Sequence, residues 1–227
     1  GAGSARLIAH GGLHQHDLVT GLYNHQFFMD RLQQSIDDAM KGNSLTTLQY
    51  IAIDNFQNIR ESVGISGCDI LINDIAGILQ KHAAEDDVVA RIGAYSYSIL
   101  RKSSKKEDLS DSSAALLKQI EDHISEVGNR SVTATCSLAI YHIDQNSPNN
   151  TNEILARTER TIDGLQQQGG NQVKVYQPVA GEMTQEEEDA EVVQHIKTAI
   201  SKNSVTALYQ PIVSIAGQGG ERYEISK

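Results

Sequence analysis

Apolar residues recur at helical spacing along several stretches of this chain, and each such stretch predicts an amphipathic helix. Phe28, Leu32 and Ile36 place one apolar stripe on a helix that starts near Phe27 and ends near residues 41–43. The same spacing predicts the other helices. They are expected over residues 5–15, from Asp69 to His82, over 116–127, over 155–165 before Gly169-Gly170, and over 184–203.

Runs of β-branched and apolar residues between turn signals predict the strands. Residues 45–53 indicate a central strand that runs directly into Asp54-Asn55. Residues 88–92 and 97–101 flank a Gly93-Ala94-Tyr95-Ser96 turn and predict a hairpin. Further strands are expected over 131–143 and 173–176, with a break at 146–150. The mixed order of helices and strands predicts an α+β fold, an α/β sandwich with helices packed on an antiparallel-containing sheet.

Composition and charge narrow the classes of function. A chain of 227 residues with 39% apolar and 21% charged residues fits a soluble protein of one domain plus a fragment. The formal net charge of −10 argues against a nucleic-acid polymer as partner, because phosphate binding needs clustered Lys and Arg. No apolar run approaches the roughly 18 residues of a membrane span, and no signal peptide is visible. We therefore expect a cytoplasmic location and no membrane contact from this segment.

Residues that commonly bind metals show no ligand pattern. Cys68 and Cys136 lie far apart in the sequence and are expected to be buried free thiols. The histidines near the start of the chain are irregularly spaced, so we expect no metal site there.

Two segments carry a resemblance to a known family. Residues 17–24 (DLVTGLYN) are similar to the D-x-L-T-G-L-x-N opening of GGDEF domains, which make cyclic di-GMP from two GTP molecules. Residues 91–97 (RIGAYSY) lie where that family has R-x-G-G-D/E-E-F. The resemblance implies a GGDEF domain over 17–177 with a mixed five-stranded sheet flanked by helices. Residues 1–16 would then be a lead-in helix or linker and 178–203 a linker helix.

The resemblance also implies which positions would bind magnesium and phosphate. The family motif D-x-D-x-F-K reads AIDNFQ over residues 52–57. The magnesium-binding Asp has thus become Ala52, and the phosphate-binding Lys has become Gln57. Asp54, the second Asp of the motif, remains. It could bind a metal, but a turn or helix-cap role is the favoured interpretation.

A second motif, N-D-x-x-G-H-x-x-G-D, reads RESVGISGCD over residues 60–69. Arg60 replaces the Asn that reads guanine in the family, whereas the Asp that pairs with it survives as Asp69. Asp69 could still bind guanine, but a cap at the start of a helix is favoured. Phe56, Asp69 and Asp54 are therefore candidates for a vestigial nucleotide site.

The family's signature motif falls on the predicted turn of residues 93–96 and is altered there. Tyr95 and Ser96 stand where the family has acids, and Gly93, Ala94 and Tyr97 complete the segment. Tyr95 and Tyr97 could form a nucleotide-stacking pair, although ordinary packing is the favoured explanation.

Further along the chain, the family's phosphate-binding Lys and Arg in A-K-x-x-G-R-N have become Gln166 and Gly170. The inhibitory R-x-x-D site has Ala84 for its Arg and ends in Asp87. Phosphoryl transfer relies on metal-assisted positioning and charge neutralisation. We therefore expect no cyclase activity, no catalytic residue and no magnesium cofactor.

The last residues resemble the start of an EAL domain, the cyclic di-GMP phosphodiesterase barrel. Residues 208–213 (LYQPIV) are similar to its Y-Q-P-I-V strand, and 223–226 (YEIS) lie on its E-A-L signature. Residues 204–227 would be an N-terminal EAL fragment ending in a β-hairpin. Gln210 and Glu224 are its candidates for contact with cyclic di-GMP or a metal.

Three functions compete on this basis. The favoured one is an inactive GGDEF-like regulatory and interaction module that relays signals to the adjoining EAL domain, as in receptor-type tandem proteins of biofilm and pilus regulation. The first alternative is a GTP-sensing domain that activates an EAL phosphodiesterase. The second is an active phosphodiesterase in the full-length protein. The expected partners are the downstream EAL domain, a second copy of the chain, and cyclic di-GMP in the full-length protein.

Overall fold

The computed structural model describes residues 15–178. The elements within this range follow one another in the order α2 His25–Met40, β1 Leu45–Ile53, α3 Phe56–His82, β2 Val88–Gly93, β3 Ser96–Ser103, α4 Ser110–Asp122, β4 Ser125–Val127, β5 Arg130–Val132, β6 Cys136–Ile143, α5 Thr151–Gln167 and β7 Val173–Val175. The expected lead-in helix over 5–15 and everything expected beyond residue 178, including Gln210 and Glu224, lie outside the described residues.

Five strands form one mixed sheet in the order β2-β3-β1-β6-β7. The first four are antiparallel to their neighbours, and β7 pairs with β6 in parallel. The central strand β1 matches the prediction for residues 45–53. The expected α+β fold with a mixed five-stranded sheet is confirmed.

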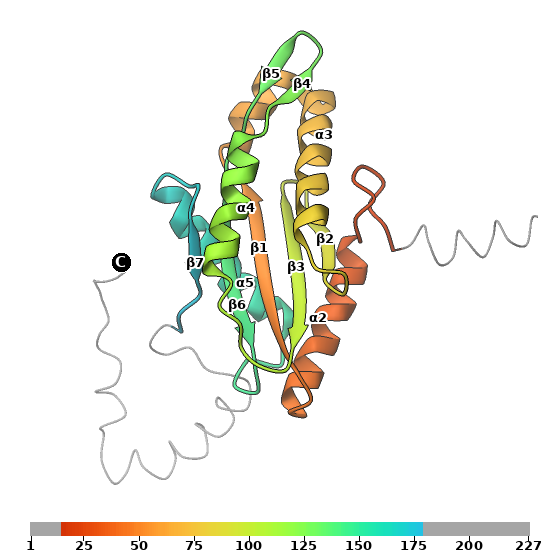
Figure 1. Ribbon diagram of the computed structural model, residues 1–227, viewed down its shortest axis with the longest axis vertical. Coiled ribbons are helices and arrows are strands. Elements are labelled where there is room, and N and C mark those ends of the chain that lie inside the picture. The colour runs from red at the N-terminus through yellow and green to blue at the C-terminus, as the bar shows by residue number, and fades with distance from the viewer. Residues whose placement is uncertain (1–14, 179–227) are drawn as a thin grey trace, which may run out of the picture. The chain divides into compact units, whose positions relative to one another are not determined.

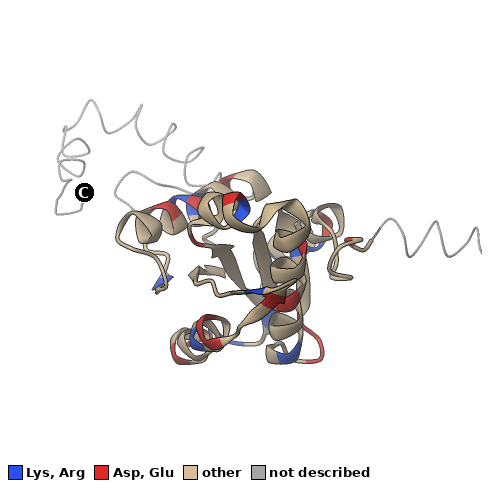
Figure 2. Ribbon diagram, turned by 90° about the horizontal axis from the view of Figure 1, so that it is seen from above, with Lys and Arg blue, Asp and Glu red and all other residues tan. Residues whose placement is uncertain are grey.

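Helices cover both faces of the sheet, with α3 and α4 on one face and α2 and α5 on the other (Figure 1). Side chains alternate along β1 because successive residues of a strand point to opposite faces. Ile51 and Ile53 join the core beneath α3 and α4, whereas Leu48 joins the core beneath α2 and its neighbours. Figure 2 shows acidic and basic residues interspersed over the outer helices.

The segment before α2 covers one edge of the sheet. The backbone N–H of Tyr23 donates to the carbonyl of Val89 at 3.1 Å, and the N–H of Arg91 donates to the carbonyl of Tyr23 at 2.9 Å. The Tyr23 ring stacks on Phe27 with centroids 3.9 Å apart. The first family-like motif therefore serves as an edge cover for β2.

Helix α3 corrects one sequence prediction. It begins at Phe56 rather than Asp69 and is bent at Gly64, whose φ of 72° and ψ of −179° are not helical. Residues 56–68 were not assigned to an element from the sequence, and in the structure they form the first part of the helix, interrupted only at Gly64. By length and composition α3 could span a membrane, but its buried residues, such as Leu71 and Ile75, lie in the core against the sheet.

The region after α4 also differs from the prediction. The expected helix over 116–127 ends at Asp122, and the expected long strand over 131–143 is divided into β5 and β6. Strands β4 and β5 pair as a hairpin around Gly128, which has a φ of 62°. A two-residue Gly-Asn connection of this kind favours a tight hairpin, so residues 128 and 129 carried a signal that helical spacing concealed.

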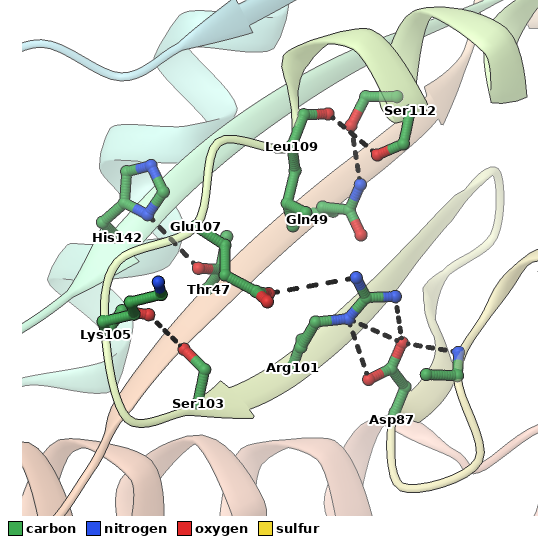
Figure 3. Close-up of polar contacts among 12 residues, drawn as sticks. Thr47, Gln49, Asp87, Arg101, Ser103, Lys105, Glu107, Leu109, Ser112 and His142 are labelled. Carbon is green, nitrogen blue, oxygen red and sulfur yellow. Dashed lines mark hydrogen bonds and ion pairs between the residues drawn. The ribbon is translucent and has the colours of Figure 1, made fainter.

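A polar network lies around the end of β3 (Figure 3). The guanidinium of Arg101 binds both carboxylate oxygens of Asp87 at 2.9–3.2 Å and lies 4.0 Å from Glu107. Asp87 also accepts the backbone N–H of Ala84 at 2.9 Å. The carboxylate at the R-x-x-D position is thus held by an arginine of its own chain.

Two histidines near this network are expected to make stability depend on pH. Burial, followed by the charge of Arg101, lowers the pKa of His82, and burial, followed by Lys106, lowers the pKa of His142. Above pH 6.5, about the ordinary pKa of histidine, His82 and His142 are neutral in both the folded and the unfolded chain. Their titration then leaves the free energy of unfolding unchanged. As the pH falls below that value, the unfolded chain binds protons first, so stability is lost until the lowered folded-state pKa values are reached.

Urea unfolding at about pH 7.5 and about pH 5.5 tests this expectation, because that interval lies above the ordinary titration range of carboxylates. The urea midpoint should fall at the lower pH, and it should fall less in a variant with His82→Gln and His142→Gln. An equal fall in both proteins would contradict the assignment.

Candidate functional site

The signature positions meet at one end of the sheet, where β1 ends and the β2–β3 turn crosses it. Ala52 pairs with Ser96 across β1 and β3. The backbone N–H of Ile53 donates to the carbonyl of Tyr95 at 3.0 Å. The two positions at which the resemblance places metal carboxylates are therefore adjacent, and they hold an alanine and a tyrosine.

Tyr95 packs on the first residue of α3. Its ring stacks on Phe56 with centroids 3.6 Å apart and an angle of 24° between the planes. Tyr95 retains 36% of its surface exposed, whereas Phe56 is buried. The aromatic pair thus joins the β2–β3 turn to α3.

Arg91 braces the same turn. Its guanidinium binds Asp17 at 3.2 Å and donates to the carbonyl of Ala94 at 2.9 Å. Asp17 in turn accepts the backbone N–H and the hydroxyl of Thr20, each at 2.8 Å. The first family-like motif and the signature turn are therefore one connected structure.

Tyr97 has a different role from Tyr95. It is fully buried, and its hydroxyl donates to the backbone carbonyl of Ile72 at 2.8 Å. Burial raises the pKa of this phenol well above its ordinary value. For Tyr97 the favoured explanation, packing, is confirmed, and the two tyrosines do not act as a pair.

Asp54 lies in the turn between β1 and α3, as one of the two favoured interpretations had it, and its carboxylate is a buried hydrogen-bond acceptor. The N-cap of α3 is Asn55, in the left-handed region with φ 52°, so the cap prediction for Asp54 is wrong. The Asp54 carboxylate is shared by four donors. They are the hydroxyls of Thr135 at 2.7 Å and Ser137 at 2.8 Å, the side-chain amide of Gln166 at 3.1 Å and the backbone N–H of Asn171 at 2.9 Å.

These contacts also account for the end of α5. Gly170 has a φ of 72°, and a Cβ there would lie 2.6 Å from the Asp54 carboxylate. Gln166, at the position of the family's lysine, binds Asp54 instead of facing a phosphate. The side chain of Asp54 therefore belongs to a different site from Phe56 and Asp69, although the resemblance made all three candidates for one nucleotide site.

Phe56 and Asp69 do share a cavity. It has a volume of about 170 Å³ and lies between the two parts of α3 and the signature turn, with Arg60, Cys68, Ile72 and Tyr95 among its lining residues. Asp69 lies inside α3, beyond the bend, so the prediction that it starts a helix is wrong. The bend at Gly64 brings Arg60 and Asp69 to one cavity.

The cavity carries two charged side chains that are available for a ligand. Neither Arg60 nor Asp69 has a hydrogen bond or an ion pair within residues 15–178. Burial raises the pKa of the Cys68 thiol at the cavity wall, which favours the neutral form. The arrangement can accept donors at Asp69 and acceptors or an anion at Arg60.

Metal-binding side chains do not cluster in this part of the molecule. Over residues 15–178, no three side chains of the His, Cys, Asp and Glu types gather closely enough to hold an ion. Cys136 is buried and free, as is Cys68.

Comparison with known proteins places this geometry in a family. Residues 14–172 match the model described as "Diguanylate cyclase, GGDEF domain". The chain therefore belongs to the GGDEF family, the domain family of cyclic di-GMP signalling proteins.

Solved structures of this family have the same fold. The FimX GGDEF domain from Pseudomonas aeruginosa is similar with a TM-score of 0.66 and 29% identity, over 70% of this chain and 98% of that one. The GGDEF domain of DgcB from Caulobacter crescentus, solved in complex with c-di-GMP, has a TM-score of 0.65 and 18% identity, over 71% and 95% of the two chains.

Curated relatives are much longer than this chain. The bifunctional diguanylate cyclase/cyclic di-GMP phosphodiesterase MucR from Pseudomonas aeruginosa is 22% identical over 200 residues, which are 87% of this chain and 28% of MucR. The chain likewise spans 30% of an uncharacterized 76.5 kDa protein from Thiocystis violacea.

Proposed function

We propose that this GGDEF domain is catalytically inactive and serves as a regulatory and interaction module of a cyclic di-GMP signalling protein. The observation that carries the proposal is the paired Ala52 and Tyr95 positions, where the aromatic ring of Tyr95 rests on Phe56 and no carboxylate is present. Metal-assisted phosphoryl transfer needs acidic ligands and phosphate-binding cations. Gln57 and Gln166 bind Glu61 and Asp54 instead.

The proposal includes an adjoining EAL domain as the recipient of the signal. Its support is the EAL-like sequence over residues 204–227, the length of the relatives, and the combination of both activities in the name of MucR. Glu224 and Gln210 would be the first EAL-side contacts with cyclic di-GMP. Magnesium has no proposed role in the GGDEF domain.

The purified chain incubated with GTP and Mg²⁺ or Mn²⁺ is expected to give no cyclic di-GMP above the blank by chromatography. Removing a single charge-stabilising group typically lowers such rates by factors of about 10² to 10³, and here several are replaced together. A GGDEF domain with intact acidic residues serves as the positive control. Product above the blank from this chain would refute the proposal.

GTP sensing is a second candidate, because the side chains of Arg60 and Asp69 line a cavity and have no hydrogen-bond or ion-pair partner among residues 15–178. Calorimetry with GTP and GDP separates the two functions. Binding in the micromolar range that is lost in Asp69→Ala would favour sensing. No heat of binding in either protein would favour an interaction module.

A further inference from the structure

The first two turns of α3, Phe56–Val63, are bounded by two residues with positive φ. Asn55 has φ 52° and ψ 37°, and its side chain makes no capping hydrogen bond. Gly64 has φ 72° and ψ −179°, a combination that is essentially restricted to glycine. Non-helical residues at both ends separate this segment from β1 and from the long part of α3. Such element-terminal residues are where hinge motion is absorbed.

The segment is weakly anchored in the core compared with the rest of the helix. Phe56 is its only buried residue, with Ile59 and Val63 partly buried. The part after Gly64 buries an apolar series that includes Leu71, Ile75 and Leu79. A segment with few buried contacts opens at a lower free energy than the core around it.

Specific contacts hold the segment at its two ends. At the first end, Phe56 stacks on Tyr95 of the β2–β3 turn. At the other end, the guanidinium of Arg130 in β5 donates to the backbone carbonyl of Ser62, and to its hydroxyl at 2.7 Å. Tyr95 and Arg130 thus bind opposite ends of one short helix from two different hairpins.

The close approach at Gly67 marks the place where the second hairpin meets the bend. A Cβ at Gly67 would lie 2.6 Å from the Cβ of Val63 and 2.9 Å from Val127 of β4. Glycine at this position lets the β4–β5 hairpin and the end of the segment come together. Val127 of the hairpin and Val63 of the segment thus both lie against Gly67.

Two cavities lie on either side of the segment. Phe56 and Arg60 line the cavity of about 170 Å³ that contains Asp69. Asn58 and Ile59 line a groove of about 320 Å³ that also contacts Glu121 and the stretch from Thr133 to Thr135. The segment thus contributes residues to both spaces.

We propose that Phe56–Val63 moves as one hinged unit about Asn55 and Gly64, held by Tyr95 at one end and latched by Arg130 at the other. A contact made on the β4–β5 hairpin then alters the cavity beside Arg60 and Asp69, and a ligand in that cavity alters the hairpin. This coupling does not depend on whether the domain makes cyclic di-GMP.

Residue-resolved amide hydrogen exchange by NMR tests the proposal. Loss of a charge-assisted hydrogen bond in Arg130→Gln should speed exchange of the hydrogen-bonded amides from Arg60 to Val63 by about tenfold or more. Tyr95→Ala should speed the same amides by one common factor, although it acts at the opposite end. Amides of β1 and β6 should be unchanged in both variants.

Two further variants serve as controls. Ser62→Ala removes only the hydroxyl partner and should give a smaller increase in the same amides. Lys102→Gln removes an exposed ion pair with Asp38 of α2 and should have no effect on the segment. The proposal fails if each substitution changes only the amides next to it, or if Arg130→Gln speeds exchange throughout the domain.

Discussion

Replacing Asp54 with alanine is expected to lower the free energy of unfolding by about 3 kcal/mol, because each buried donor left unsatisfied costs about 1–3 kcal/mol and several lose one shared acceptor. Asp54 is 4% exposed and its carboxylate accepts four hydrogen bonds, so its loss leaves several buried donors without that acceptor. Urea denaturation monitored by circular dichroism measures the change.

Two comparisons make this result specific. Asp54→Asn keeps the shape but exchanges one acceptor oxygen for a donor, so a loss intermediate between wild type and Asp54→Ala is expected. Asp163→Asn, at an exposed carboxylate of α5, should change stability by less than about 0.5 kcal/mol. A loss below about 1 kcal/mol for Asp54→Ala would show that the network is not a main support of the fold.

Gly170→Ala is expected to cost about 3 kcal/mol, from a left-handed backbone together with overpacking. The added Cβ would meet the Asp54 carboxylate at 2.6 Å. Gly42 provides a matched control, because its φ of 73° is nearly the same and nothing lies within 4 Å of a Cβ there. Gly42→Ala should therefore show the backbone cost alone, about 1–2 kcal/mol.

The difference between the two glycine variants isolates the clash with Asp54. In an Asp54→Ala background, Gly170→Ala should cost no more than Gly42→Ala. Equal losses for the two glycines in the wild-type background would contradict the close contact.

Local patterns were sufficient to predict the sheet and most of its helices. The apolar run of residues 45–53 and the stripe formed by Phe28, Leu32 and Ile36 were each decided by neighbours within a few residues. The β4–β5 hairpin was missed because Ile124 and Val127 happen to continue the helical spacing of Leu116 and Ile120. Directly after α4 ends at Asp122, the side chains of His123 and Ser125 bind Asp74 of α3, a tertiary contact that periodicity does not reveal.

The site was harder to predict, since its contacts join residues far apart in the chain. Asp54 binds Thr135 and Asn171, which are 81 and 117 positions away. Nothing near Asp54 in the sequence distinguishes a buried acceptor from a cap. Arg130 gave no signal, because its partner Ser62 is 68 positions away in the chain and only the fold brings the two together. Arg60 and Asp69, nine positions apart, line one cavity in a helix that is bent at Gly64 between them.

The contacts of Tyr23 set a limit on how far a GGDEF domain of this kind can be truncated from its N-terminus. By satisfying Val89 and Arg91, its backbone occupies the hydrogen-bonding groups of β2 that would otherwise recruit a foreign strand. A fragment trimmed to begin at α2 would leave a bare β-edge, and self-association in such a truncated protein would reflect the trimming and not its native assembly.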